Sequence, residues 1–145
     1  MKKYLFLGLA IILVLGGIIV PKVMRGNDGK VSFKVMEEGD VPEKIKEILP
    51  KYIMEERALT CKYDDEIFVI VTRGEKKSKG YSVKVDSIVK EKYSNDQFDL
   101  VVYAKFTDPD PNEIVSPEYD YPYTIVKTNL KEMPQEIHLD IEYLD

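Results

Sequence analysis

A long apolar run close to the N-terminus constrains this chain more than any other feature of its sequence. Residues 4–20 carry no charge, follow Met-Lys-Lys, and end at Pro21. At about 1.5 Å per residue the run makes roughly 25 Å of helix, the short end of a membrane-spanning segment. It is longer than the apolar core of a typical signal peptide, and no small-x-small cleavage site follows it. We therefore expect residues 1–24 to be an uncleaved membrane anchor, with a transmembrane helix at about 4–20.

A cleaved signal peptide is the alternative to this anchor. A buried core helix is disfavoured, because so apolar a segment has little to bury against in so short a chain. A lipid-attached protein would need a cysteine directly after the run, but the single cysteine, Cys61, lies far beyond it. Basic residues flank the run on both sides, so the positive-inside comparison is nearly balanced. The short N-terminal tail and the long domain behind the run resemble a bacterial-type signal-anchor. This arrangement predicts a single-pass cell-membrane protein with its C-terminal domain outside.

The remaining sequence is long enough for one ordinary domain and too short for two. Excluding Lys2 and Lys3 leaves 19 of the 21 Lys and Arg residues against 26 Asp and Glu residues, a net charge of −7. Nucleic acids and anionic lipid surfaces bind clustered Lys and Arg, so no nucleic-acid partner is expected. One cysteine cannot form an internal disulfide, and we expect Cys61 to be a small buried or half-buried residue.

Apolar and polar residues alternate through most of the chain behind a short glycine-bearing tether at 25–30. Alternation predicts half-buried strands, and a continuous apolar run predicts a central one. One helix is expected at about 41–49, with Asp40 and Glu43 forming a capping box and Pro50 kinking or restarting it before a further turn within 51–58. The predicted fold class is mostly β (α+β), a small sheet or sandwich-like domain at 31–145 with one short helical segment. Strands are expected at 31–36, 67–71, 81–86, 98–106, 123–127 and 137–143.

The sequence offers no recognisable set of catalytic residues. The only histidine, His138, lies on the polar face of an amphipathic strand, where we expect it to face solvent. Ser–His or Cys–His catalysis would depend on this one residue. One His and one Cys in separate elements do not predict a zinc site. We therefore expect a protein that is not an enzyme and that uses no metal or cofactor.

The spacing of Asp108, Asp110 and Asn112 matches the start of a calcium-binding loop. The complete pattern also needs a glycine at loop position six and a glutamate at position twelve. This chain has Glu113 and Tyr119 there, and two prolines stiffen the backbone between the acidic residues. A solvated acidic loop is the better interpretation, and calcium binding stays an open alternative.

Two segments have the composition of a contact surface. The first is the loop 74–81, which places three lysines between two strands of an acidic domain. The second, 118–123, is acidic and aromatic, and aromatic residues beside rigid prolines are typical of binding surfaces. The alternative is that the tyrosines of the second segment only cover the end of the core. The predicted partner-binding residues are Lys76, Ser78, Gly80, Tyr81, Tyr119, Tyr121 and Tyr123.

These two segments resemble the C-terminal domain of the PrcB family, named for an accessory subunit of a bacterial surface protease complex. In that family an apolar strand leads into Gly-x-Lys-Pro-Thr-Gly-Gly-Tyr, and a later proline loop ends Tyr-Pro-Tyr before another apolar strand. Here the matching segments are the strand 68–71, the loop 74–81 with the sequence GEKKSKGY, and the tripeptide 121–123. The resemblance covers about 66–128. The chain departs from the pattern at Lys77, Ser78 and Lys79, where the family favours Pro, Thr and Gly.

The resemblance implies a non-catalytic, surface-displayed domain that binds and stabilises a protease. The leading hypothesis is therefore a membrane-anchored extracytoplasmic binding domain that serves as an accessory subunit of a surface protease complex. The loop 74–81 also resembles, more weakly, a loop of chagasin-type protease inhibitors. A second hypothesis is thus a module that blocks a protease active site with this loop. A third is a structural envelope protein without a dedicated ligand.

Overall fold

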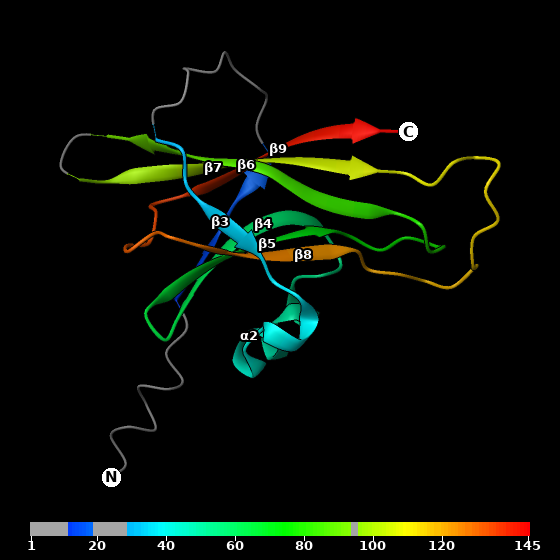
Figure 1. Cartoon of the computed structure of the whole chain (residues 1–145), viewed down its shortest axis with the longest axis horizontal. Coiled ribbons are helices and arrows are strands. Elements are labelled where there is room, and N and C mark those ends of the chain that lie inside the picture. Colours follow the sequence, from blue (N-terminus) through cyan, green and yellow to red (C-terminus); the bar gives the residue numbers. More distant parts are fainter. Residues whose placement is uncertain (1–11, 19–28, 94–95) are drawn as a thin grey trace, which may run out of the picture.

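Two β-sheets packed face to face form the domain in the computed structural model, which describes residues 12–18, 29–93 and 96–145 (Figure 1). The first sheet has the strand order β1-β4-β5-β8-β3 and the second β2-β9-β7-β6. This architecture confirms the predicted mostly β fold with one short helical segment. The first sheet comprises β1 (Ile12–Leu15), β4 (Glu56–Tyr63), β5 (Glu66–Arg73), β8 (Tyr123–Thr128) and β3 (Phe33–Val35), and the second comprises β2 (Gly17–Ile18), β9 (Ile137–Leu144), β7 (Phe98–Thr107) and β6 (Ser82–Lys92).

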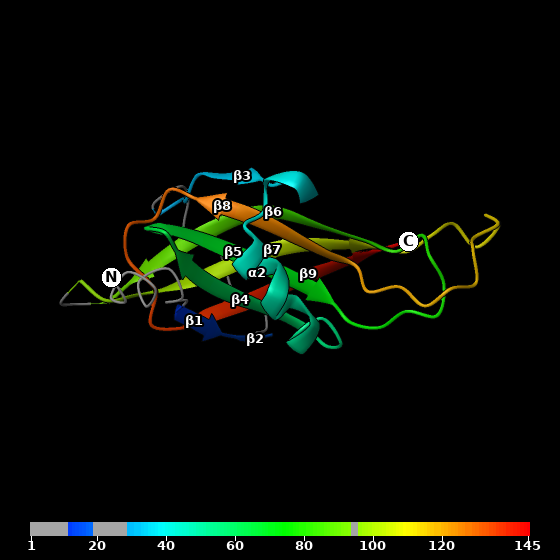
Figure 2. The same cartoon turned by 90° about the horizontal axis from the view of Figure 1, so that it is seen from below.

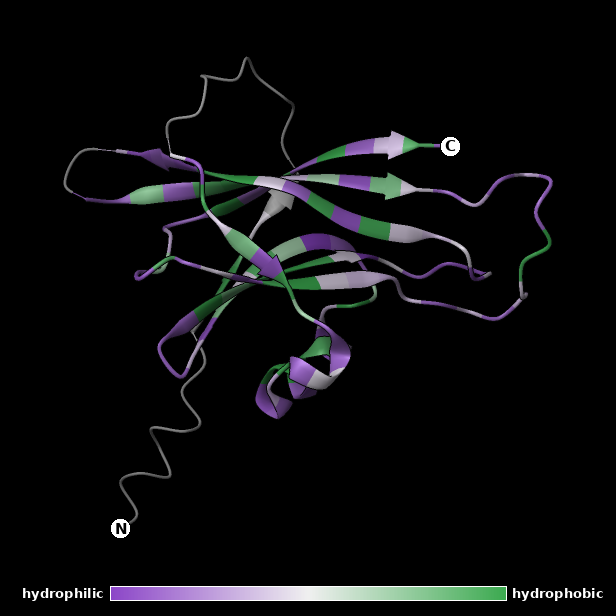
Figure 3. Cartoon of the chain, viewed as in Figure 1, coloured by the Kyte–Doolittle hydropathy of each residue, from purple (hydrophilic) through white to green (hydrophobic). Residues whose placement is uncertain are grey.

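The main hydrophobic core lies between the two sheets. Alternate residues of β7, from Phe98 to Phe106, point into it and meet Ile67, Val69 and Val71 from β5. Figure 3 shows hydrophobic and hydrophilic residues alternating along parts of the second sheet. Burial of a large apolar side chain is worth about 1.5–3 kcal/mol relative to exposure. The apolar side chains between the sheets are therefore the main source of stability.

A smaller apolar cluster covers the outer face of the first sheet. Ile45 and Leu49 pack there against Phe68, Ile70 and Ile125. They come from a helical segment that lies across the first sheet (Figure 2). The segment consists of η1 (Glu38–Asp40), α2 (Glu43–Ile48) and η2 (Leu49–Lys51).

The predicted capping box at the start of the helix is wrong, whereas the predicted effect of Pro50 is confirmed. Asp40 ends the 3-10 turn η1, and the next two residues, Val41 and Pro42, are extended. Pro42 is therefore the N-cap of α2, and no side-chain hydrogen bond caps the helix. At the other end α2 stops at Ile48 and the 3-10 turn η2, which contains Pro50, follows. Proline lacks the amide hydrogen that would continue the α-helical bonding.

Strand β4 replaces part of the helical turn predicted within 51–58. The strand runs antiparallel to both β1 and β5, so it lies inside the first sheet. Its central residues, Ala58, Leu59, Thr60 and Cys61, are all fully buried. A strand that is covered on both faces lacks the alternation from which strands were predicted.

Strand β6 is longer than predicted because a bulge interrupts its alternation. Val83 and Val85 face the core in the first half of the strand. The register with β7 then shifts between Val85 and Ser87, after which Ile88 faces the core. One extra residue in a bulge moves the inward positions by one. The alternation visible at 81–86 therefore ends well before the strand does.

The transmembrane helix predicted at 4–20 is not what the structure has at 12–18. There β1 pairs antiparallel with β4, and β2 pairs parallel with β9, so the segment covers one edge of each sheet. An exposed sheet edge presents unpaired backbone groups, which a short apolar strand satisfies. The rest of the predicted helix, 4–11 and 19–20, lies outside the described residues. Among the residues that the structure describes, no helix has the length and apolarity needed to cross a membrane.

The end of the predicted tether is part of the folded domain. The Lys90 amide donates to the Gly29 carbonyl at 2.7 Å, and Lys30 forms a bridge with Val89 of β6. Residues 25–28 lie outside the described part of the chain. The domain therefore begins at least two residues before the predicted boundary at 31.

Candidate functional site

Two long loops come together at one end of the sandwich (Figure 1). Residues 74–81 connect β5 to β6, and residues 108–122 connect β7 to β8; together they are called the loop platform here. The Lys76 amide donates to the Asp120 carbonyl at 2.8 Å, and the Asp120 amide returns a bond to the Lys76 carbonyl at 2.9 Å. The Lys79 amide also donates to the Ser116 carbonyl at 3.0 Å. Backbone bonds thus make one surface from two distant segments.

Side chains add a second set of contacts between the two loops. The Tyr121 hydroxyl donates to a carboxylate oxygen of Glu75 at 2.9 Å. The Lys79 ammonium lies 3.9 Å from Asp120 and 4.0 Å from Glu118. Exposed pairs of this kind contribute about 0–1 kcal/mol each. They match the charges of the basic and acidic loops, while the backbone bonds set the geometry.

Both glycines of the first loop have backbone angles that other residues adopt only under strain. Gly74 has φ +92° and Gly80 has φ +106°. A Cβ atom at Gly80 would also come within 2.9 Å of Pro109 Cβ and 3.1 Å of a Val115 methyl group. Glycine permits both the turn and the close approach of the two loops. The glycines quoted for the family pattern therefore have a structural reason in this chain.

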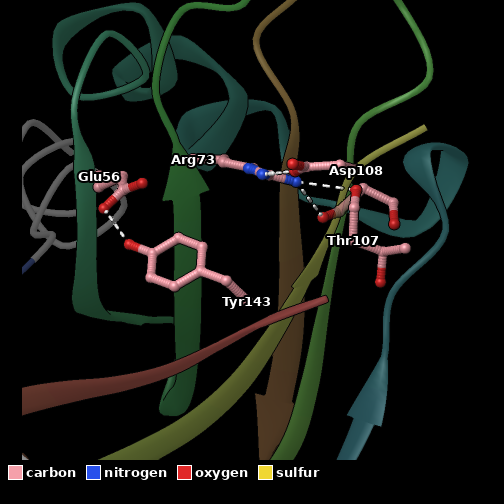
Figure 4. Close-up of polar contacts among 6 residues, drawn as sticks. Glu56, Arg73, Thr107, Asp108 and Tyr143 are labelled. Atoms are coloured by element: carbon pink, nitrogen blue, oxygen red, sulfur yellow. Dashed lines mark hydrogen bonds and ion pairs between the residues drawn. The ribbon is translucent and has the colours of Figure 1, made fainter. Parts of the chain in front are cut away.

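Arg73, the last residue of β5, joins the two sheets beneath the loop platform. Its guanidinium donates to the Thr107 carbonyl at 2.8 Å, to the Ser82 carbonyl at 3.3 Å, and to the Asp108 carboxylate (Figure 4). The side chain is only 3% exposed. The planar guanidinium can serve several acceptors at once, which offsets the cost of burying its charge. Arg73 thereby ties the end of β5 to the bases of both loops.

Two tyrosine side chains, Tyr81 and Tyr143, lie near Arg73 beneath the loop platform. The Arg73 guanidinium carbon lies 4.9 Å from the ring centre of Tyr81, and the Lys76 ammonium lies 5.2 Å from the same ring. These are cation–π distances. Beside them, the Tyr143 hydroxyl of β9 donates to Glu56 of β4 at 2.9 Å (Figure 4). This second link between the sheets lies at the same end of the sandwich as Arg73, because Glu56 pairs with Arg73 across β4 and β5.

The outermost apolar groups of the platform belong to the 108–122 loop. Ile114 is 99% exposed and Tyr119 is 62% exposed. Burial of Ile114 in an interface would remove a complete branched side chain from water, a gain of about 1.5–3 kcal/mol. The loop also carries five acidic residues and no basic one. The 108–122 loop thus combines apolar side chains that face water with acidic ones, of which Asp108, Glu118 and Asp120 lie against Arg73 or Lys79.

The structure brings together most of the residues predicted to bind a partner, in different roles. Lys76 and Tyr121 form bonds between the two loops, Gly80 permits their close approach, and Tyr81 packs against Arg73 and Lys76. The Ser78 hydroxyl donates to the adjacent Lys79 carbonyl at 3.2 Å. Tyr119 faces solvent. Tyr123 is the exception in position, because it begins β8 and lines a small hollow with Met36 and Val41 beside the helical segment.

Sequence reasoning missed the roles of three residues at this end of the sandwich: Arg73, Asp108 and Ile114. A charged residue directly after a continuous apolar strand was the available signal for Arg73. The partner of Arg73 could not be found in the sequence, because Asp108 lies 35 positions away.

The acidic start of the 108–122 loop has internal partners for its side chains. Asp108 is bound by Arg73, and the Asn112 amide donates to the Asp110 carboxylate at 2.9 Å. The Asp110 amide donates in turn to the Glu113 carboxylate at 3.2 Å. These bonds form a local turn in which the Asp110 and Glu113 carboxylates accept from backbone amides. They favour the solvated acidic loop over the calcium loop.

Cys61 behaves as a structural residue. It is fully buried beneath the helical segment, and burial raises the pKa of its thiol to about 12. A thiol with so high a pKa stays protonated at neutral pH and is a poor nucleophile. The predicted buried position is confirmed.

Comparison with known proteins gives one match. The family model described as PrcB C-terminal matches residues 67–129. Neither the curated proteins nor the solved structures yield a match to this chain. The matched segment runs from β5 to the residue after β8 and contains both loops of the platform. The match over residues 67–129 therefore supports a PrcB C-terminal domain in this chain.

Proposed function

We propose that this protein is a non-catalytic binding module that holds a protein partner on its loop platform. In the leading form of the proposal, the partner is a surface protease and the module is its accessory, stabilising subunit. The observation that carries the proposal is the pair of exposed apolar residues, Ile114 and Tyr119, on a loop whose position the bonds between Lys76 and Asp120 fix.

Fixing the loops before binding favours association. A flexible loop would lose conformational freedom on binding, at a cost of about 0.5–1.5 kcal/mol for each immobilised side chain. The paired backbone of the platform has already met part of this cost during folding. Aromatic and branched apolar side chains at the centre of an interface commonly dominate its affinity.

The inhibitor hypothesis differs from the leading proposal in the effect that the module has on protease activity. Loop 74–81 would have to enter an active site, yet Lys76 and Lys79 use backbone groups of this loop to bind 108–122. We therefore place inhibition second. Titration of the domain against surface proteases separates the two functions, because an inhibitor lowers proteolytic activity whereas a stabilising subunit preserves it.

The proposal includes a location outside the cell membrane, and it treats a helical anchor at 4–20 as the alternative to the strands at 12–18. Attachment by a helix would require residues 12–18 to leave β4 and β9, so the two arrangements exclude one another. Removal of residues 1–28 distinguishes them. If residues 12–18 are part of the sheets, the truncated domain unfolds at a lower urea concentration than the full chain. If they are an anchor, the unfolding midpoint stays the same, and extraction of the full chain from cell membranes requires detergent.

Capture of the full chain from membranes tests the binding function. The double variant Ile114→Ser/Tyr119→Ser removes the exposed apolar groups without touching the bonds between the loops. Loss of interface anchors of this size weakens binding by about tenfold or more. The matched control is Tyr93→Ser, because Tyr93 is 50% exposed and lies beyond the opposite end of β7. Equal recovery of the same partner with the double variant and the control would contradict the proposal.

A further inference from the structure

A second group of functional side chains lies at the end of the sandwich opposite the loop platform. Asp99 is the second residue of β7, Glu136 directly precedes β9, and His138 is the second residue of β9. The two strands are parallel and pair Leu100 with Ile137 and Val101 with His138. Asp99 and Glu136 are therefore neighbours across the strands, and His138 follows two positions later on the same face. This face points away from the core, because Leu100 and Ile137 point into it.

The three side chains converge on one point. The His138 Nε2 atom lies 3.1 Å from a carboxylate oxygen of Asp99 and 3.6 Å from a carboxylate oxygen of Glu136. One donor atom from each of the three residues falls within 4.8 Å of the other two. Two ligands at about 2.0–2.2 Å from a tetrahedral zinc ion are roughly 3.4 Å apart. The observed separations leave room for a metal ion among the three atoms with small side-chain movements.

Asp99 provides an independent reason to expect a cation. The residue is only 7% exposed, and its second carboxylate oxygen, Oδ1, is buried without a hydrogen-bond partner. A buried carboxylate is costly unless a cation or several donors compensate its charge. Among the described side chains, His138 is the one that forms an ion pair with it. Glu136 adds negative charge to the same face, as does Glu91 of β6, which pairs with Asp99 across β6 and β7.

We propose that Asp99, Glu136 and His138 form a binding site for a divalent transition-metal ion of the zinc type. One imidazole nitrogen and two carboxylate oxygens suit zinc and its neighbours, whereas calcium and magnesium prefer oxygen ligands alone. Three protein ligands leave a fourth tetrahedral position open to water or to a donor from a partner. Bound metal would also join the start of β9 to β7. The site is separate from the loop platform and does not depend on its function.

The single histidine gives the site a direct spectroscopic signal. In the full chain, titration with Zn²⁺ should shift the imidazole resonances of His138 in a saturable, 1:1 manner, and the thermal unfolding midpoint should rise. Ca²⁺ at the same concentration should leave the imidazole resonances in place. The sequence-based expectation that His138 simply faces solvent predicts no shift with either ion.

Two variants and one control test the assignment of the ligands. Asp99→Asn and Glu136→Gln preserve side-chain shape and should each weaken Zn²⁺ binding by about tenfold or more, since even the partners of metal ligands contribute that much. Glu142→Gln is the matched control, because Glu142 is an exposed carboxylate on the same face of β9. Circular dichroism confirms that each variant is folded. Unmoved imidazole resonances at millimolar Zn²⁺ would overturn the site, as would equal Zn²⁺ affinity for Asp99→Asn and the parent protein.

Discussion

The two ends of the sandwich are organised in different ways. At the loop end, residues far apart in the chain meet because long irregular segments are tied together by backbone bonds and by Arg73. At the opposite end, Asp99, Glu136 and His138 meet because the parallel register of β7 and β9 aligns them. Substitutions at the loop end can therefore alter the shape of the loops. Substitutions at the strand end change the metal-binding side chains and leave the paired strands in place.

The two ends also differ in how much of each the family match covers. Both loops of the platform lie within residues 67–129, which the family model covers. Of the other group, Asp99 lies within that segment, while Glu136 and His138 lie beyond it. The loop end therefore belongs to the matched family domain, and the strand-end group combines the domain with a strand from outside it.

The largest effect should come from the residue that supports the loop end. Arg73→Gln removes the charge that binds Asp108 and two carbonyl groups, and we expect a loss of about 3–4 kcal/mol in unfolding free energy. Urea denaturation measures it. The matched control is Arg57→Gln in the neighbouring strand, whose more exposed side chain pairs with Glu55, and the expected loss there is below about 1 kcal/mol. Equal losses in the two variants would contradict the role assigned to Arg73.

Zinc should act on the other end alone. At a free Zn²⁺ concentration 100 times the dissociation constant, the folded state gains about 2.7 kcal/mol. Hydrogen exchange should slow at the Leu100 amide, which donates to the Glu136 carbonyl at 2.9 Å, and stay unchanged at the Lys76 amide. Equal slowing of hydrogen exchange at both amides would show that the two ends are coupled. It would contradict the view that they are organised independently.

A change at Gly80 should loosen the platform without affecting the strand end. Gly80→Ala places a methyl group against Pro109 at a positive φ angle, and we expect a loss of about 1–3 kcal/mol. Hydrogen exchange at the Lys76 and Lys79 amides should become faster. Gly39→Ala is the control, because a methyl group there meets no atom within 4 Å. A neutral Gly80→Ala substitution would mean that the loops can separate and re-pack freely.

The smallest effect should come from the second link between the sheets. Tyr143→Phe removes the hydroxyl that donates to Glu56, and because Tyr143 is 58% exposed we expect a loss of only about 0.5 kcal/mol. Chemical denaturation with replicate fits can resolve such a change. A loss of unfolding free energy larger than that expected for Arg57→Gln would mean that the Tyr143 hydroxyl stabilises the sandwich more than an exposed hydrogen bond does.

Alternation in the sequence determined much of the fold. Strands such as β7 and β9 were predicted at nearly their observed positions, since one face of each packs on the core and the other does not, and β5 was predicted from its continuous apolar run. Of β6, only the first half was predicted. The break in the helical segment near Pro50 was also predicted, because proline lacks the amide hydrogen that α-helical bonding needs. The loop motif around Gly74 and Gly80 further predicted the PrcB C-terminal domain, which the family model confirms.

Tertiary structure decided the rest, because the missing information is in pairings between distant residues. β4 has no alternation, since the core between the sheets buries one of its faces and the helical segment covers the other. The residues 12–18, apolar enough to suggest a membrane helix, form strands in the structure because the edges of β4 and β9 lie open beside them. The contacts of Arg73 with the 108–122 loop, and of Asp99 with His138, depend on strand order and register. A pattern among neighbouring residues of the sequence predicts neither strand order nor register.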